Sequence, residues 1–208
     1  INAINSNLKM HKFLFQGAPG TGKTETVKQI ARLLERDLFA VEFNYVIDSK
    51  LGQTSKNIKE LFQEINSLPN PRRAIILFDE IDAIALDRIN SNDLREMGRV
   101  TSSIIKELDN LNEEVVLIAT TNLFKSLDKA LARRFDTVIS FNEYEKEDLI
   151  KIAELLLDKY ISSYPNIRKN KRLFNKILNV SEHIPYPGEL KNIIKTAVAF
   201  SDISNPYD

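Results

Sequence analysis

Residues 17–24 carry the residue types and the spacing that are needed to hold a chain of phosphates. They read Gly-Ala-Pro-Gly-Thr-Gly-Lys-Thr, after an apolar run and before a helix-like continuation. Such glycines let successive backbone N–H groups curl around phosphate oxygens, while Lys23 can reach the β and γ phosphates and the Thr24 hydroxyl can ligate Mg2+. The following helix adds its positive N-terminal end. The pattern predicts a nucleoside triphosphate site that is made by Gly17, Pro19, Gly20, Thr21, Gly22, Lys23, Thr24 and Glu25.

A second candidate segment places two acids directly after an apolar run. Residues 75–78 read Ile-Ile-Leu-Phe and are followed by Asp79 and Glu80. A buried strand would direct these acids into the ligand crevice, where Asp79 can hold Mg2+ through water and Glu80 can deprotonate the water that attacks the γ phosphate. An enzyme that passed the phosphate to another substrate would have less use for Glu80. Alone, the segment is equally compatible with a solvated acidic turn, but its pairing with residues 17–24 favours the catalytic interpretation.

Two further segments carry polar side chains near predicted strands. Asn122 follows the apolar run 115–119 and could hydrogen-bond the γ phosphate or the attacking water, although a plain turn or helix cap also fits. Arg133 and Arg134 precede the last predicted strand, where surface ion pairs are the simpler alternative. His11 and His183 lack the spacing of a metal site, and we assign them no role.

The composition excludes several classes of function. The 208 residues include 29 basic and 29 acidic side chains, so no global field recruits nucleic acid or an anionic membrane. The basic run 168–172 fits a solvated loop better than a nucleic-acid contact. With 0 cysteines, disulfides, thiol catalysis and Cys-ligated zinc are excluded. The apolar runs are too short for a membrane span and the start resembles no signal peptide, so we expect a cytoplasmic location. Because the sequence has no initiator Met, we expect a fragment or a processed protein.

Alternation of short β-favouring runs with helix-period segments predicts an α/β fold. The expected fold is a five-stranded parallel sheet with helices on both faces, followed by a small all-helical domain. Its ligands should bind at the carboxyl ends of the strands. The predicted domains are a nucleotide-binding domain over 1–142 and a helical lid over 143–208. Strands are expected at 12–16, 38–44, 74–78, 115–119 and 136–141, and helices at 24–36, 55–68, 92–111, 149–160, 173–180 and 189–200.

Together these segments resemble the AAA+ ATPases, and more closely their AAA subgroup, over nearly the whole chain. Residues 17–24 resemble Walker A, residues 75–82 resemble Walker B, and Asn122 matches sensor 1. Residues 127–136 are similar to the family segment that ends in Gly-Arg-Phe-Asp-Arg. This match places Arg134 at the first arginine finger, which in the family reaches the neighbouring subunit's nucleotide. Thr137 stands where a second finger would be.

Two other matches concern the pore and the lid. Residues 49–55 resemble the first pore loop, but Lys50-Leu51-Gly52 lacks the aromatic residue that polypeptide-threading members usually carry. Threading of a polypeptide and a simple strand-to-helix loop are both open. Residues 187–192 resemble sensor 2, with Gly188 where many AAA+ proteins have Arg. The lid would then close on nucleotide through backbone and packing contacts, or Gly188 serves only as a turn.

The resemblance implies ATP binding and Mg2+-dependent hydrolysis, with ATP or ADP and Mg2+ as the bound groups. Glu80, Asn122 and Arg134 would be catalytic, and Thr24 and Asp79 would hold the metal. It further implies a ring, usually a hexamer, that remodels or unfolds a protein substrate. An ATP-gated assembly or switch that recruits an effector is the alternative. A nucleic-acid loader or helicase is weakened by the zero net charge, and a GTPase by the lack of an Asn-Lys-x-Asp segment.

Overall fold

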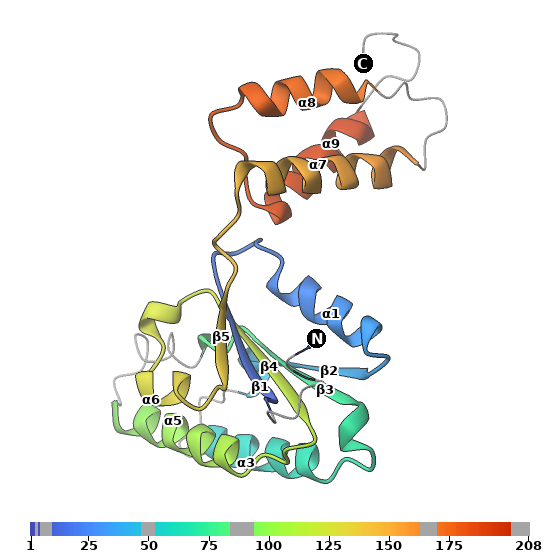
Figure 1. Cartoon of the computed structure of the whole chain (residues 1–208). Helices are drawn as coiled ribbons and strands as arrows, with labels where there is room; N and C mark the ends of the chain where they lie inside the picture. The colour runs from blue at the N-terminus through green and yellow to red at the C-terminus, as the bar shows by residue number, and fades with distance from the viewer. Residues whose placement is uncertain (3, 5–9, 47–52, 84–93, 163–169, 201–208) are drawn as a thin grey trace. The chain divides into compact units, whose positions relative to one another are not determined.

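The computed structural model describes residues 1–2, 4, 10–46, 53–83, 94–162 and 170–200 (Figure 1). Contacts divide the chain into two compact units. The first unit comprises Ile1–Ala18 and Lys23–Phe141, and the second comprises Pro19–Gly22 and Asn142–Asp208. The tip of the glycine-rich loop therefore groups with the C-terminal residues, although the rest of that loop belongs to the first unit.

The first unit is built on a five-stranded parallel sheet, as the sequence predicts. Its spatial order is β2-β3-β4-β1-β5. Since every strand runs in the same direction, all carboxyl ends lie at one edge, which is where the candidate site residues follow β1, β3 and β4. The strands are β1 (Lys12–Gln16), β2 (Asp37–Glu42), β3 (Ala74–Asp79), β4 (Val116–Thr121) and β5 (Thr137–Ser140).

Helices cover both faces of this sheet, which confirms the predicted layers (Figure 1). On one face, Ile75 and Leu77 of β3 join a core cluster with Val27 of α1 (Lys23–Leu33). On the other face, Ile76 and Phe78 join a cluster with α3 (Gln53–Asn66) and α5 (Leu94–Asp109). This alternation follows from the two-residue period of a strand, and burial on both faces explains why β3 is apolar throughout.

Short elements that the sequence did not predict lie between the main ones. The predicted strand 38–44 ends early, because Phe43 begins a short helix and packs its ring edge-on against Phe78 at 4.9 Å between centroids. The short helices are α2 (Phe43–Val46), η1 (Pro71–Arg73), η2 (Phe124–Ser126) and α6 (Lys129–Ala132).

The C-terminal part of the second unit is helical, as predicted. It contains α7 (Lys146–Ile161), α8 (Lys171–Val180) and α9 (Pro187–Phe200). Its own hydrophobic core includes Leu149 and Ala153 from α7, Leu178 from α8, and Leu190, Ile194 and Val198 from α9. This separate core is what allows the helical part to form a compact unit of its own.

Candidate active site

Lys23 is the charged residue of the glycine-rich loop, and its ammonium group is enclosed by acceptors. Lys23 is the first residue of α1, in the segment after β1, and it is only 7% exposed. Nζ donates to Gly17 O at 2.7 Å, to Ala18 O at 2.9 Å and to Asn122 Oδ1 at 2.8 Å. Burial lowers the pKa of Lys23, and the nearby carboxylates Asp82, Asp79 and Glu80 only partly offset this. The loop therefore presents a cation that gains from a further negative partner.

Thr24 and Asp79 meet at the start of α1 and the end of β3. The Thr24 hydroxyl donates to Asp79 Oδ1 at 3.0 Å, and the Thr120 hydroxyl donates to the same oxygen at 2.6 Å. A hydroxyl beside a carboxylate supplies the oxygen ligands that Mg2+ prefers, and the remaining positions usually go to waters and substrate phosphates. The donor set at Thr24 and Asp79 thus fits the predicted metal.

Glu80 has a backbone conformation that is unusual for a residue with a side chain. Its φ angle is 54°, in the left-handed region, and its N–H donates to Thr120 Oγ1 at 3.0 Å. The next N–H, from Ile81, donates to Thr120 O at 3.0 Å. Such a conformation costs on the order of 1–3 kcal/mol and is concentrated at functional sites. Thr120 of β4 therefore holds Glu80 in a strained position while it also binds Asp79.

Asn122 joins the residues that the sequence proposed separately. Its Oδ1 accepts from Lys23, and its Nδ2 lies 3.5 Å from Glu80 Oε1. Its own N–H donates to Asp82 Oδ1 at 3.1 Å, and Asp82 is only 4% exposed. The structure therefore brings Lys23, Glu80 and Asn122 together, with Asp82 fixing the backbone of Asn122.

Arg134 and Glu25 lie outside this cluster. Arg134 Nε donates to both carboxylate oxygens of Asp109, the last residue of α5, at 3.0 and 3.3 Å. The segment around it is tied to β1, since Asp136 Oδ2 accepts the N–H groups of His11 and Lys12 at 2.8 Å each. Glu25 is exposed in the first turn of α1 and accepts from Gln29 at 3.1 Å.

The tip of the loop makes its contacts within the second unit. Gly20 O accepts from Gly188 N–H at 2.7 Å, and Thr21 O accepts from the Tyr144 hydroxyl at 2.7 Å. Gly20 and Gly22 have φ angles of 78° and 94°, which suit glycine. A Cβ on Gly188 would lie 2.7 Å from Gly20 Cα, so glycine at 188 is what permits the close approach. Pro19 is exposed beside them.

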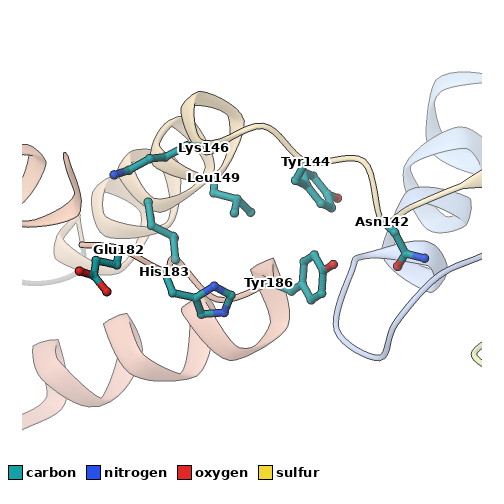
Figure 2. Close-up of a pocket in the computed structure, with 8 residues that line it drawn as sticks. Asn142, Tyr144, Lys146, Leu149, Glu182, His183 and Tyr186 are labelled. Carbon is teal, nitrogen blue, oxygen red and sulfur yellow. The ribbon is translucent and has the colours of Figure 1, made fainter. Parts of the chain in front are cut away.

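A pocket of about 280 Å³ lies in the same unit (Figure 2). Tyr144 and Tyr186 form part of its wall, with ring centroids 6.2 Å apart. Figure 2 shows their hydroxyl ends pointing toward the end of the pocket at which Asn142 lies. Lys146 Nζ donates hydrogen bonds to Asn179 O and Ser181 O, at 2.8 Å each. The lining residues are Asn142, Tyr144, Lys146, Leu149, Glu182, His183, Ile184 and Tyr186.

Four residues of this geometry were not among the predicted site residues: Asp82, Asp109, Thr120 and Tyr144. Thr120 shares the strand period with Asn122, so the two-residue alternation was an available signal for it. Asp109 and Tyr144 carried no local signal, because their partners are distant in sequence. The possible pore residues 50–52 lie outside the described residues, as do Arg168 and Lys169.

Comparison with known proteins identifies the family. Residues 13–143 match the family model AAA, described as "ATPase family associated with various cellular activities". The chain belongs to the AAA family. This confirms the resemblance inferred from Walker A, Walker B and sensor 1, and it agrees with the parallel sheet described above.

Relatives of this AAA domain occur in bacteria, archaea and eukaryotes. The chain is 40% identical over 134 residues to an uncharacterized AAA family ATPase, y4kL, of Sinorhizobium fredii, covering 64% of this chain and 39% of the relative. It is 35% identical over 154 residues to a putative 26S proteasome regulatory subunit homolog of Methanothermobacter thermautotrophicus, covering 73% of this chain and 40% of the relative. It is 34% identical over 158 residues to the peroxisomal ATPase PEX6 of Dictyostelium discoideum, covering 73% of this chain and 13% of the relative. The chain thus spans less than half the length of these relatives.

Within the described ranges, no helix of the AAA domain combines the length and the apolar character that a membrane crossing requires.

Proposed function

We propose that this AAA domain binds ATP together with Mg2+ and hydrolyses it. The observation that carries the proposal is the cluster at the ends of β3 and β4, in which Asn122 accepts from Lys23 and lies beside Glu80. A cation for the phosphates, a candidate base and an amide that can orient water are thereby in one place. Thr24 and Asp79 supply the oxygen ligands for the metal next to them.

Each residue of the cluster has a definite role in this mechanism. Lys23 and the loop amides bind the phosphates, as the P-loop pattern requires. Thr24 would hold Mg2+ directly and Asp79 would hold it through water, and the bound metal would supply neutralisation of the charge on the phosphate oxygens. Glu80 accepts the proton of the attacking water, and Asn122 holds that water in line. Positioning and electrostatics do most of the work in phosphoryl transfer, so the rigid hydrogen bonds to Thr120 and Asp82 support the same function.

The pocket in the second unit supports binding of a complete nucleotide. Ligand pockets are usually concave, with apolar and aromatic walls and a few polar groups. Here Tyr144, Tyr186 and Leu149 supply such walls, and Tyr144 also bonds to the loop tip through Thr21. We infer that this pocket can hold the base and sugar of a nucleotide.

Two substitutions separate binding from hydrolysis. Lys23→Ala should abolish Mg-ATP binding, because it removes the cation and three hydrogen bonds. Glu80→Gln should bind Mg-ATP normally and hydrolyse it about 100- to 10,000-fold more slowly, as loss of a general base predicts. Binding is measured by isothermal titration calorimetry and hydrolysis by phosphate release.

The matched control is Glu60→Gln, which changes an exposed glutamate of α3 that pairs with Lys56 on the same helix. It should leave both measurements unchanged. The proposal would be wrong if the unmodified protein bound no nucleotide, or if Glu80→Gln hydrolysed ATP as fast as Glu60→Gln.

The activity of the whole protein is proposed from the family. In a ring assembly, Arg134 of each subunit would act on the nucleotide of its neighbour. The printed names of two relatives, a proteasome regulatory subunit homolog and a peroxisomal ATPase, support remodelling or unfolding of a protein as the output. We further propose the domain division at residue 142, and a cytoplasmic location stays a prediction.

Stimulation of hydrolysis identifies the partner. The ATPase rate should rise when an unfolded protein such as reduced casein is added, and it should not respond to single-stranded DNA. Slow turnover that ignores casein but accompanies ATP-dependent assembly would instead support a switch. A response to DNA alone would contradict the proposed protein substrate.

A further inference from the structure

Two consecutive carbonyl groups at the tip of the P-loop are engaged by groups outside the loop. Gly20 O accepts from Gly188 N–H, in the first turn of α9, and Thr21 O accepts from the Tyr144 hydroxyl, which precedes α7. Both distances are 2.7 Å, which is short for an N–H donor and normal for a hydroxyl. Thr21 is fully buried, so its bond to Tyr144 is shielded from solvent in the intact protein.

Each of these bonds orients an N–H group as well as a carbonyl. A trans peptide is planar, so the carbonyl of one residue and the N–H of the next point in opposite directions. No cis peptide occurs in the described part of the chain. The Thr21 carbonyl that faces Tyr144 therefore sends the Gly22 N–H away from Tyr144. In the same way, the bond to Gly188 sends the Thr21 N–H away from α9.

The peptide that the Tyr144 hydroxyl holds ends in a glycine, whose backbone rotates more easily than that of other residues. That peptide joins Thr21 to Gly22, and Gly22 has a φ angle of 94° in a region that glycine enters and leaves at little cost. Without the hydroxyl, the Thr21–Gly22 peptide can turn so that a carbonyl replaces an N–H at the phosphate side. A carbonyl oxygen there would repel a phosphate, whereas an N–H would bind it.

We propose that Tyr144 is a positioning residue for the phosphate site, which it serves by holding the Thr21–Gly22 peptide with its N–H available to a nucleotide phosphate. The inference rests on the proposed function, and it adds a residue that positions the loop tip within its own unit. Phosphate binding and the Tyr144 bond favour the same peptide orientation, so each strengthens the other, and the coupling is reciprocal.

The protonation state of Tyr144 is compatible with this role. Burial raises the pKa of the Tyr144 hydroxyl, and the charge of Asp148 raises it further. The group therefore stays protonated and remains a donor across the physiological pH range.

The test compares Tyr144→Phe with Tyr160→Phe. Both substitutions delete one hydroxyl from a partly buried ring of the helical part, but Tyr160 of α7 does not line the pocket, and of the two hydroxyls only that of Tyr144 bonds to the loop. Tyr144→Phe should raise the Kd for Mg-ADP roughly fivefold, the value expected for one neutral hydrogen bond, while Tyr160→Phe should change it less than about twofold. Competition by adenosine, which has no phosphates, should be the same in both variants.

A second measurement reports on the loop directly. Without nucleotide, hydrogen exchange of the peptide that covers residues 17–24 should become faster in Tyr144→Phe only, with the melting temperatures of both variants close to that of the unmodified protein. Equal ADP affinity in the two variants, or weaker adenosine binding in Tyr144→Phe, would overturn the positioning role alone. An unmodified protein that fails to bind ADP would overturn the proposed function and this inference with it.

Discussion

Lys23 carries its charge at a position where burial opposes it, which makes nucleotide binding depend on pH. Burial lowers the pKa of Lys23 below the ordinary 10.5 in the nucleotide-free protein. Phosphates at Nζ would raise that pKa again. Above the lowered pKa, the free protein has lost the proton that the bound form keeps, so binding must take up a proton. The Kd for Mg-ADP should therefore increase with pH, by up to about tenfold per pH unit.

The measurement is calorimetry in two buffers of different ionisation enthalpy, above about pH 8, where the ordinary titrations of carboxylates and histidine are complete. The apparent enthalpies should differ by the proton taken up. Lys23→Arg is the control, since arginine stays charged over this range, and its affinity should not vary with pH. The same pH dependence in Lys23→Arg would assign the proton to another group.

The sequence identifies site residues whose chemistry is local. Residues 17–24, Asp79 and Glu80 stand in short spacings, and each spacing has a mechanical reason that holds without a structure. Thr120 lies 40 residues from Glu80, and its hydrogen bonds exist only because β3 and β4 are adjacent in the sheet. Tyr144 is more distant still from Thr21. Tyr144 therefore carried no signal in the sequence, and the strand alternation that Thr120 shares with Asn122 was only an indirect one.

At the scale of elements, the approach of α9 to the loop tip depends on the absence of one side chain. A Cβ on Gly188 would lie 2.7 Å from Gly20 Cα and 3.1 Å from Gly20 O, and neither is the end of a flexible side chain. Gly188→Ala must therefore push the loop tip and the start of α9 apart. We expect the Kd for Mg-ADP to rise roughly tenfold or more, in line with the cost of overpacking.

Gly98→Ala is the matched control for this substitution. Gly98 lies inside α5, and a Cβ there would meet nothing within 4 Å. This variant should bind ADP normally and gain about 0.5–1 kcal/mol in free energy of unfolding, because alanine favours a helix interior. Urea denaturation measures the gain. Normal ADP binding by Gly188→Ala would show that the close approach is not needed.

The end residues of several helices and strands could not be predicted, because they depend on the conformation or packing of individual residues. The helix predicted over 24–36 ends at Leu33, since Glu35 adopts a φ angle of 51° and Arg36 N–H bonds back to Ala31 O at 2.9 Å. Glycine is the usual signal for this turn, and the sequence has glutamate there. The strand predicted to reach residue 44 ends before Phe43, where packing against Phe78 overrides β propensity. The order of elements and their layers, by contrast, follow from periodicity alone.

At the scale of the whole molecule, Arg134 lies outside the candidate active site of its own chain, and a role at a neighbouring subunit stays a prediction. The structure shows it paired with Asp109, and both side chains are partly exposed. A partly exposed pair contributes only about 0–1 kcal/mol, so Arg134 can leave Asp109 for a phosphate at little cost. Asp136 meanwhile holds the segment to β1 through two backbone N–H groups. The chain thus presents a cation on a fixed segment with a weakly held side chain.

If Arg134 acts on a neighbouring subunit, two inactive variants should restore each other. Arg134→Ala keeps an intact nucleotide site but lacks the finger, whereas Lys23→Ala keeps the finger but lacks the site. An arginine finger is worth about 10³- to 10⁵-fold in rate, so each variant alone should be nearly inactive. In a mixed ring, the arginine of a Lys23→Ala subunit reaches the ATP of an Arg134→Ala subunit. The phosphate release of the mixture should therefore exceed the sum of the two separate rates.

The concentration dependence of that recovery decides how Arg134 acts. Complementation through a shared site requires contact, so the recovered rate should increase with total protein and should follow the assembled fraction in sedimentation run with ATP. Arg133→Ala, which removes the exposed neighbouring arginine, is the control. It should hydrolyse ATP by itself, without being mixed with a second variant. Two results would contradict the predicted role of Arg134 at a neighbouring subunit. One is full activity of Arg134→Ala alone. The other is an assembled mixture whose rate equals the sum of the two separate rates at every concentration, and either would leave Arg134 with only its ion pair to Asp109. Each subunit would then hydrolyse ATP with its own residues alone.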